Sequence, residues 1–149
     1  MTASFTAVVR VAAAPEVVWA RLTDWPSHAR WFPSTTIDVL APNGLGGEFV
    51  ARTGVGALRF PDRMRVVEWT PPRGGRAGRC TLVKLSRVLR GTAWLDVLPA
   101  RGGSRVLWSE RLLVPPPLGA PSRALFARAL HKMASELEAE LATEPDSAR

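Results

Sequence analysis

The chain has 149 residues, of which 46% are hydrophobic and 22% are charged, so we expect one globular domain with a sizeable core and little room for a second domain. Its net charge of +7 reflects 20 lysines and arginines against 13 acidic residues, and the basic residues are spread along the sequence. A nucleic-acid-binding protein usually concentrates positive charge on one element within a recognisable motif, so composition and charge argue against a nucleic-acid partner.

The N-terminal part of the chain predicts one strand and two short helices. Apolar and polar residues alternate over residues 4–13, which is the period of a strand with one buried face. Pro15 suits the first turn of a helix, and the apolar positions after it continue at helical spacing to Leu22. Pro26 ends this helix and opens a second short helix over residues 27–32.

Glycines and prolines divide the middle of the chain into short apolar segments, a pattern typical of hairpins in an antiparallel sheet. Six further strands are predicted over residues 35–42, 46–54, 63–72, 78–85, 88–99 and 104–115. With the N-terminal strand, they predict a sheet of seven strands.

Helical spacing returns near the C-terminus, with Ser122 as the expected N-cap. The apolar stripe of this helix consists of Leu125, Phe126, Ala129, Leu130, Met133, Ala134, Leu137 and Leu141. Residues 143–149 are polar and include Pro145, so we expect a frayed tail there and a single domain over residues 1–142.

Several classes of protein are disfavoured by what the sequence lacks. No apolar run approaches the roughly 18 residues of a membrane-spanning helix, and the first residues do not have the pattern of a secretory signal. We therefore expect a cytoplasmic protein without integral membrane association. The single cysteine, Cys80, excludes an intramolecular disulfide, and with only His28 and His131 beside it a structural zinc site has too few ligands. We expect no metal and no cofactor.

The order of the predicted elements indicates an α+β fold in which the long helix covers one face of a curved sheet. The segments "APEVVWARLTDWPSHARWFP", "VVEWTPPR", "LVKLSRVLRGTAWLDVLP" and "GGSRVLWSERLLVPP" resemble the helix-grip superfamily. That superfamily contains START lipid-transfer domains, birch-pollen-allergen-like proteins and bacterial polyketide cyclases. The chain resembles most closely the bacterial polyketide cyclase/dehydrase and lipid-transport (SRPBCC) family, over residues 3 to about 141.

This resemblance implies a helix-grip fold, in which a seven-stranded antiparallel sheet wraps around the long C-terminal helix and two short helices follow the first strand. An apolar cavity is then expected between the sheet and the long helix. Family members carry lipids or quinones or cyclise polyketides, so the resemblance indicates a shape rather than one reaction.

Within such a fold, Trp19 is expected in the core, because an apolar position inside a helix is usually buried. Trp31 and Phe32 lie where a helix gives way to a strand, so they either line the mouth of the cavity or plug the core. The small residues Gly91 and Ala93 either leave cavity volume or allow tight packing. The candidate ligand-lining residues are Trp31, Phe32, Trp69, Trp108, Phe126, Leu130 and Met133.

Strand parity places Glu110 on the same face as Trp108 and Leu112, and the resemblance implies that this face points inward. Desolvation would then penalise the charged carboxylate unless it has a partner. Two alternatives are open: Glu110 forms a structural ion pair with Arg63 or Arg65, or it presents a proton acceptor to a bound ligand.

Few other residues suit catalysis, and the chain has no tyrosine. His28 is expected to be a solvated helix residue rather than a general base, and His131 to be an exposed or half-buried residue of the long helix. Ser34, Thr35 and Thr36 are not accompanied by a recognisable histidine–acid pair, so a nucleophilic triad has no support.

The sequence therefore predicts a carrier or sensor that binds a hydrophobic or amphipathic small molecule, such as a lipid, a quinone or a polyketide-like compound, between the sheet and the long helix. Glu110 and Arg63 or Arg65 would orient a polar group of that ligand. The alternative is a polyketide cyclase/dehydratase-type enzyme in which Glu110 transfers a proton. A third class is a protein whose basic surface docks an acidic protein or a membrane.

Overall fold

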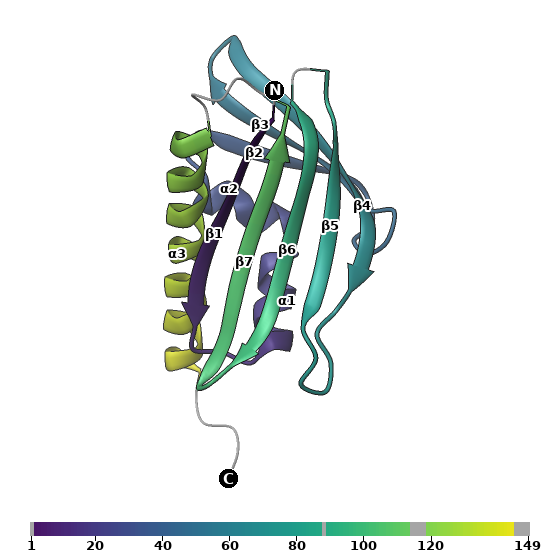
Figure 1. Ribbon diagram of the computed structural model, residues 1–149. Coiled ribbons are helices and arrows are strands. Elements are labelled where there is room, and N and C mark those ends of the chain that lie inside the picture. The colour runs from purple at the N-terminus through teal and green to yellow at the C-terminus, as the bar shows by residue number, and fades with distance from the viewer. Residues whose placement is uncertain (1, 88, 114–118, 145–149) are drawn as a thin grey trace.

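The computed structural model describes residues 2–87, 89–113 and 119–144, which form a curved antiparallel sheet with a long helix against it (Figure 1). The strands are β1 (Ala3–Val11), β2 (Thr35–Ala41), β3 (Glu48–Val55), β4 (Leu58–Thr70), β5 (Gly78–Leu85), β6 (Arg90–Ala100) and β7 (Gly103–Leu112). Their order across the sheet is β1-β7-β6-β5-β4-β3-β2. The architecture confirms the predicted helix-grip fold.

The predicted strands agree closely with the observed ones, except that β4 starts at Leu58 rather than at Arg63. Residues 58–63 pair with β3, whereas the pairing of β4 with β5 begins only at Met64. Pro61 has no N–H to donate, and such a residue is tolerated where one edge of a strand is unpaired. This proline is the reason that the sequence pattern predicts a later start.

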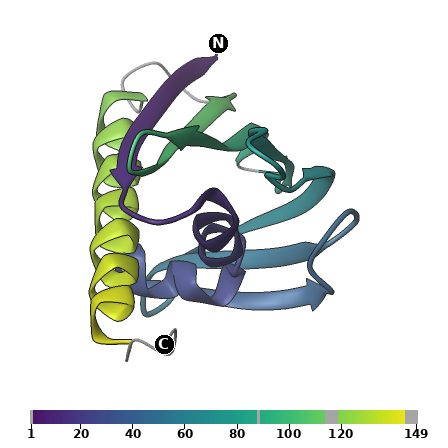
Figure 2. The same cartoon turned by 90° about the horizontal axis from the view of Figure 1, so that it is seen from below.

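The long helix α3 (Gly119–Thr143) begins at Gly119, so the prediction that Ser122 is its N-cap is wrong. Pro121 falls in the first turn, where a backbone N–H would have no intrahelical partner. The helix lies across the open side of the sheet, beside β1 (Figure 2). Of the predicted polar tail, residues 145–149 lie outside the described part of the chain.

Two short helices lie inside the curve of the sheet (Figure 2). Helix α1 (Pro15–Leu22) begins at the predicted proline, and a 3-10 turn, η1 (Trp25–Ser27), leads directly into α2 (His28–Trp31). The helix predicted over residues 27–32 is therefore observed as a single α-helical turn, and the 3-10 turn precedes it.

Glu136 of α3 joins these short helices to the long one. Its Oε1 atom lies 2.7 Å from Nη1 of Arg21 and 2.5 Å from Nη2 of Arg30, and Trp31 donates its Nε1–H to Oε2 at 3.3 Å. The hydrogen bond from Arg30 is the main cause that holds the pKa of Glu136 below its usual range. One carboxylate thus fixes the end of the fold where α1 and α2 meet α3.

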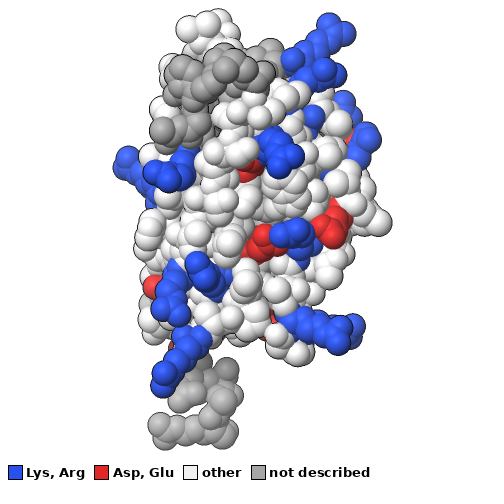
Figure 3. Space-filling view, viewed as in Figure 1, with Lys and Arg blue, Asp and Glu red and all other residues white. Residues whose placement is uncertain are grey.

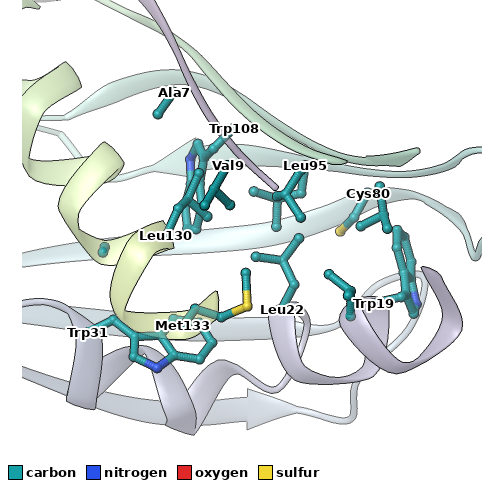
Figure 4. Close-up of a cluster of buried hydrophobic side chains, with 14 of the residues drawn as sticks. Ala7, Val9, Trp19, Leu22, Trp31, Cys80, Leu95, Trp108, Leu130 and Met133 are labelled. Carbon is teal, nitrogen blue, oxygen red and sulfur yellow. The ribbon is translucent and has the colours of Figure 1, made fainter. Parts of the chain in front are cut away.

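The core fills the part of the interior next to α1, where side chains of the sheet, α1 and α3 meet (Figure 4). Trp19 is 5% exposed, which confirms that it belongs to the core, and its ring packs edge-on against Trp69 with centroids 5.1 Å apart. The stripe of α3 contributes Ala129, Leu130, Met133, Ala134 and Leu137 as buried residues.

Basic side chains are spread over the face of the sheet that Figure 3 shows, with acidic ones beside several of them. Among the described residues, none of the helices combines the length and hydropathy that crossing a membrane requires. The same residues contain no group of three or more histidines, cysteines or carboxylates placed to hold a metal ion.

Gly91 of β6 stands where the backbone of β7 approaches closely. Its φ is +153°, and a Cβ atom built there would lie 2.1 Å from the carbonyl oxygen of Arg111. Ala93 is fully buried in the core. Both small residues therefore serve close packing.

We expect Gly91→Ala to lower the free energy of unfolding by about 2 kcal/mol. The added methyl group would clash with backbone atoms of β7, which cannot move aside as a side chain can. Gly74→Ala is the control: its φ is also positive, at +54°, but a Cβ atom there has no neighbour within 4 Å. Urea unfolding should show a loss of only about 1 kcal/mol for this variant, the conformational cost alone. Equal losses in the two variants would contradict the close approach at Gly91.

Candidate functional site

A cavity of about 390 Å³ lies inside the sheet, at the end away from α1, between β2–β5 and β7 on one side and the start of α3 on the other. Its wall is mostly apolar and aromatic. The lining residues are His28, Phe32, Pro33, Thr35, Ile37, Phe49, Ala51, Thr53, Phe60, Pro61, Asp62, Met64, Lys84, Leu89, Trp108, Glu110, Leu112, Ser122, Leu125 and Phe126.

Three aromatic rings from three different elements form one wall of this cavity. Phe32 follows α2, Trp108 belongs to β7 and Phe126 to α3. The centroids of Phe32 and Trp108 are 5.9 Å apart, and the ring of Phe126 lies 4.9 Å from each of them, all edge to face. Such a cluster offers apolar surface and the polarisable faces that bind flat or aliphatic ligands.

The other predicted lining residues lie elsewhere. Trp31 is 1% exposed and packs in the core, while Trp69 is engaged with the ring of Trp19. Leu130 and Met133 are fully buried core residues of α3. None of these four is among the residues that line the cavity. Of the predicted apolar set, the structure brings together Phe32, Trp108 and Phe126.

A wider depression of about 770 Å³ lies on the outer face, where β1, β6 and β7 meet. It is lined by Thr2, Ala3, Ser4, Phe5, Thr6, Trp94, Ser109, Glu110, Arg111 and Arg123. Because this depression is open to solvent and mostly polar in its lining, it has less of the character of a small-molecule site than the interior cavity.

Glu110 does face inward, as parity predicts, and it is 2% exposed. Its partner is Lys84 of β5, whose Nζ lies 3.8 Å from Glu110 Oε1. Trp108 donates its Nε1–H to the same oxygen at 3.0 Å, and Lys84 also forms an ion pair with Oδ2 of Asp62 on β4. We call Asp62, Lys84 and Glu110 the interior triad.

Strand β6 lies between the two strands that carry Lys84 and Glu110. In the register of the sheet, Lys84 is opposite Gly91 and Glu110 is opposite Ala93. Because neither of these residues has a long side chain, the ammonium and the carboxylate approach each other across β6.

Burial and the attraction between opposite charges act together on the pKa values of Lys84 and Glu110. Desolvation raises the pKa of Glu110 above its usual value, against the attraction of Lys84 and the hydrogen bond from Trp108. Desolvation acts to lower the pKa of Lys84, but its attraction to Glu110 and Asp62 outweighs that effect, so its pKa is raised. Both changes favour the retention of protons on Lys84 and Glu110.

The predicted ion pair of Glu110 with Arg63 or Arg65 is wrong. Both arginines point to the outer face of β4, where their side chains bind Glu48 with N···O distances of 2.6 and 2.5 Å. The hydrogen bonds from Arg63 and then Arg65 lower the pKa of Glu48. The sequence does contain a signal for the true partner. In β5, alternate residues Cys80, Leu82 and Lys84 all face inward and are buried.

His28 is 4% exposed, so the prediction of a solvated residue is wrong. Its ring lies 4.8 Å from that of Trp31 and 5.4 Å from that of Trp108, and Nε2 is 2.7 Å from the carbonyl oxygen of Leu22. Only a protonated Nε2 can donate to a carbonyl, so Nδ1 of the neutral ring is an acceptor. Desolvation lowers the pKa of His28 to about 4.

The chain belongs to the family described as polyketide cyclase / dehydrase and lipid transport, whose model matches residues 2–144. This membership confirms the resemblance drawn from the sequence. Among curated proteins, none matches the chain.

Several solved structures share this fold at low sequence identity. A protein of unknown function from Staphylococcus aureus, SA2116, matches with a TM-score of 0.75 and 11% identity over 96% of this chain and 98% of its own. A STAR-related lipid transfer protein fragment from Xanthomonas axonopodis has a TM-score of 0.67 and 16% identity, with 90% and 85% covered. A norcoclaurine synthase from Thalictrum flavum has a TM-score of 0.65 and 12% identity, with 95% and 97% covered.

The pKa of His28 predicts a pH dependence of stability. In the unfolded chain the ring binds a proton near pH 6.5, whereas in the fold it does so only at about pH 4, so protonation favours unfolding in this interval. The free energy of unfolding should therefore fall by about 3 kcal/mol between these two pH values. Urea unfolding of His28→Phe should lack this fall, while the exposed His131→Gln should keep it. A fall of the same size in His28→Phe would contradict the assignment.

Proposed function

We propose that the protein binds a hydrophobic or amphipathic small molecule in the interior cavity and acts as its carrier or sensor. The observation that supports this most is the cavity itself, which lies between the sheet and α3 and combines aromatic side chains with a few buried polar groups. Small-molecule sites generally combine these features at volumes of roughly 300–1,000 Å³. Membership of a family that includes lipid transport is consistent with the proposal.

Burial of apolar surface would supply most of the affinity. At roughly 25 cal/mol for each Å² of apolar surface removed from water, a ligand that covers the rings of Phe32, Trp108 and Phe126 gains several kcal/mol before the cost of association is subtracted. The polar groups of the wall would then decide the orientation of the ligand rather than the bulk of its affinity.

The second candidate function is a reaction that involves proton transfer, of the cyclase or dehydratase type, with Glu110 as the acid or base. Its support is the raised pKa of a carboxyl group that lines a cavity, since catalytic groups are often found in such surroundings. Here Lys84 would hold the carboxylate in place, and Trp108 would orient it.

Binding in the cavity can be tested by reducing its volume. Ala51 lies in the wall, so we expect Ala51→Phe to raise the Kd of a neutral fluorescent probe such as 1-aminoanthracene by about tenfold. Ala41→Phe adds the same ring to β2 outside the lining and should leave the Kd unchanged. Fluorescence titration measures both variants, and equal affinity in wild type and Ala51→Phe would place the probe elsewhere.

Glu110→Gln separates the two functions, because glutamine keeps the size of the side chain and can accept the hydrogen bond from Trp108 but cannot transfer a proton. If the protein is an enzyme, turnover of a polyketide-type substrate should be lost while the ligand Kd changes by less than about threefold. Turnover that persists in Glu110→Gln would rule out the catalytic role, and an equal loss of turnover and affinity would assign Glu110 a structural one.

A further inference from the structure

One oxygen of the interior triad has no hydrogen-bond partner among the described residues. Lys84 binds Oδ2 of Asp62, whereas Oδ1 of the same carboxylate is shielded from solvent and accepts no hydrogen bond from any described residue. A buried acceptor that has lost water without gaining a donor carries an uncompensated desolvation cost. Other atoms of Asp62 are part of the cavity wall, so a rotation of its carboxyl group would bring Oδ1 to a molecule in the cavity, which could then supply the missing donor.

Lys84 has more hydrogen-bond donors than it has acceptors close by among the described residues. Its ammonium group has three N–H donors, and among the described residues only Asp62 accepts one of them at short distance. The sulfur of Met64 lies at 3.8 Å and is a weak acceptor, and Glu110 Oε1, also at 3.8 Å, is beyond a direct hydrogen bond. The pair therefore presents an unmet acceptor and an incompletely used donor side by side.

We propose that Asp62 and Lys84 form a headgroup site for a hydroxyl group carried by an otherwise apolar ligand, such as a phenol or a fatty alcohol. A hydroxyl group is both donor and acceptor: it would donate to Asp62 Oδ1 and accept from Lys84 Nζ. This inference rests on the proposed binding function and adds the chemical class of the ligand.

The charges of the triad select against other headgroups. A carboxylate or phosphate would meet Asp62 and Glu110, two groups of its own sign. An ammonium group could donate to Asp62 Oδ1, but it has no acceptor for the N–H groups of Lys84 and would lie beside a group of its own sign. A ketone or an ether could accept from Lys84, but it would leave Asp62 Oδ1 without a donor and place a second oxygen lone pair against it. A hydroxyl group satisfies both partners.

Two probes of similar shape test the proposal. 2-Naphthol carries the hydroxyl group, and 2-methoxynaphthalene replaces its proton by a methyl group. Isothermal titration calorimetry of the wild-type protein should give a Kd about tenfold lower for 2-naphthol, the value of one additional buried hydrogen bond. Equal Kd values would leave the proposed binding function standing and overturn the headgroup site. Binding of neither probe would overturn both.

The double variant Asp62→Leu/Lys84→Met removes the polar pair and keeps its volume, an exchange that folded proteins often tolerate. We expect it to abolish the preference for 2-naphthol. The matched control is Arg79→Met/Asp96→Leu, which removes an ion pair with a 2.6 Å contact from the outer face of the sheet. This control should retain the tenfold preference.

A preference that survives in the Asp62/Lys84 double variant would overturn the proposal, because the hydroxyl group would then be recognised elsewhere. If that variant does not fold, Asp62→Asn gives the same test. It keeps the shape of the side chain but removes the charge of the acceptor, and charge-assisted hydrogen bonds are about twice as strong as neutral ones. The preference should fall by about threefold, and an unchanged ratio would overturn the site.

Discussion

The structure depends on one geometric constraint, which is that a straight helix covers a strongly curved sheet. Helix α3 packs mainly against β1, at one edge, and spans the open side without following the sheet (Figure 2). The space that remains is too large for the side chains of α3 alone. At one end α1 enters it and builds the core around Trp19 and Leu22. At the other end the cavity lies between the sheet, the start of α3, and His28 and Phe32 at the two ends of α2.

The polar interior follows from the same geometry. The inward faces of β4, β5 and β7 converge on the cavity, and each of them contributes one member of the interior triad. In a close-packed core these three charges would carry a large desolvation cost. Beside a cavity, part of that cost can be offset by the molecule that occupies it. We therefore regard Asp62, Lys84 and Glu110 as the feature that most separates this interior from a purely structural core.

Much of the fold is predictable from the sequence, because proline positions, strand alternation and the stripe of the C-terminal helix are local signals. Parity correctly places Glu110 inward, yet its partner depends on which strands are neighbours: Lys84 is two strands away in the sheet and distant in sequence. Arg63 is the wrong choice because its strand presents it to the outer face. The burial of His28 is not predictable from the sequence for a related reason, because the aromatic rings around it come from η1, α2 and β7 together.

Native mass spectrometry tests the central claim, that the interior is a binding cavity, most directly. The purified protein would be measured before and after incubation with a mixed panel of lipids, quinones, long-chain alcohols and aromatic polyketides, and any bound molecule would be released by denaturing extraction and identified. We expect a one-to-one complex with an apolar molecule. A protein that keeps its bare mass with every member of the panel would contradict it.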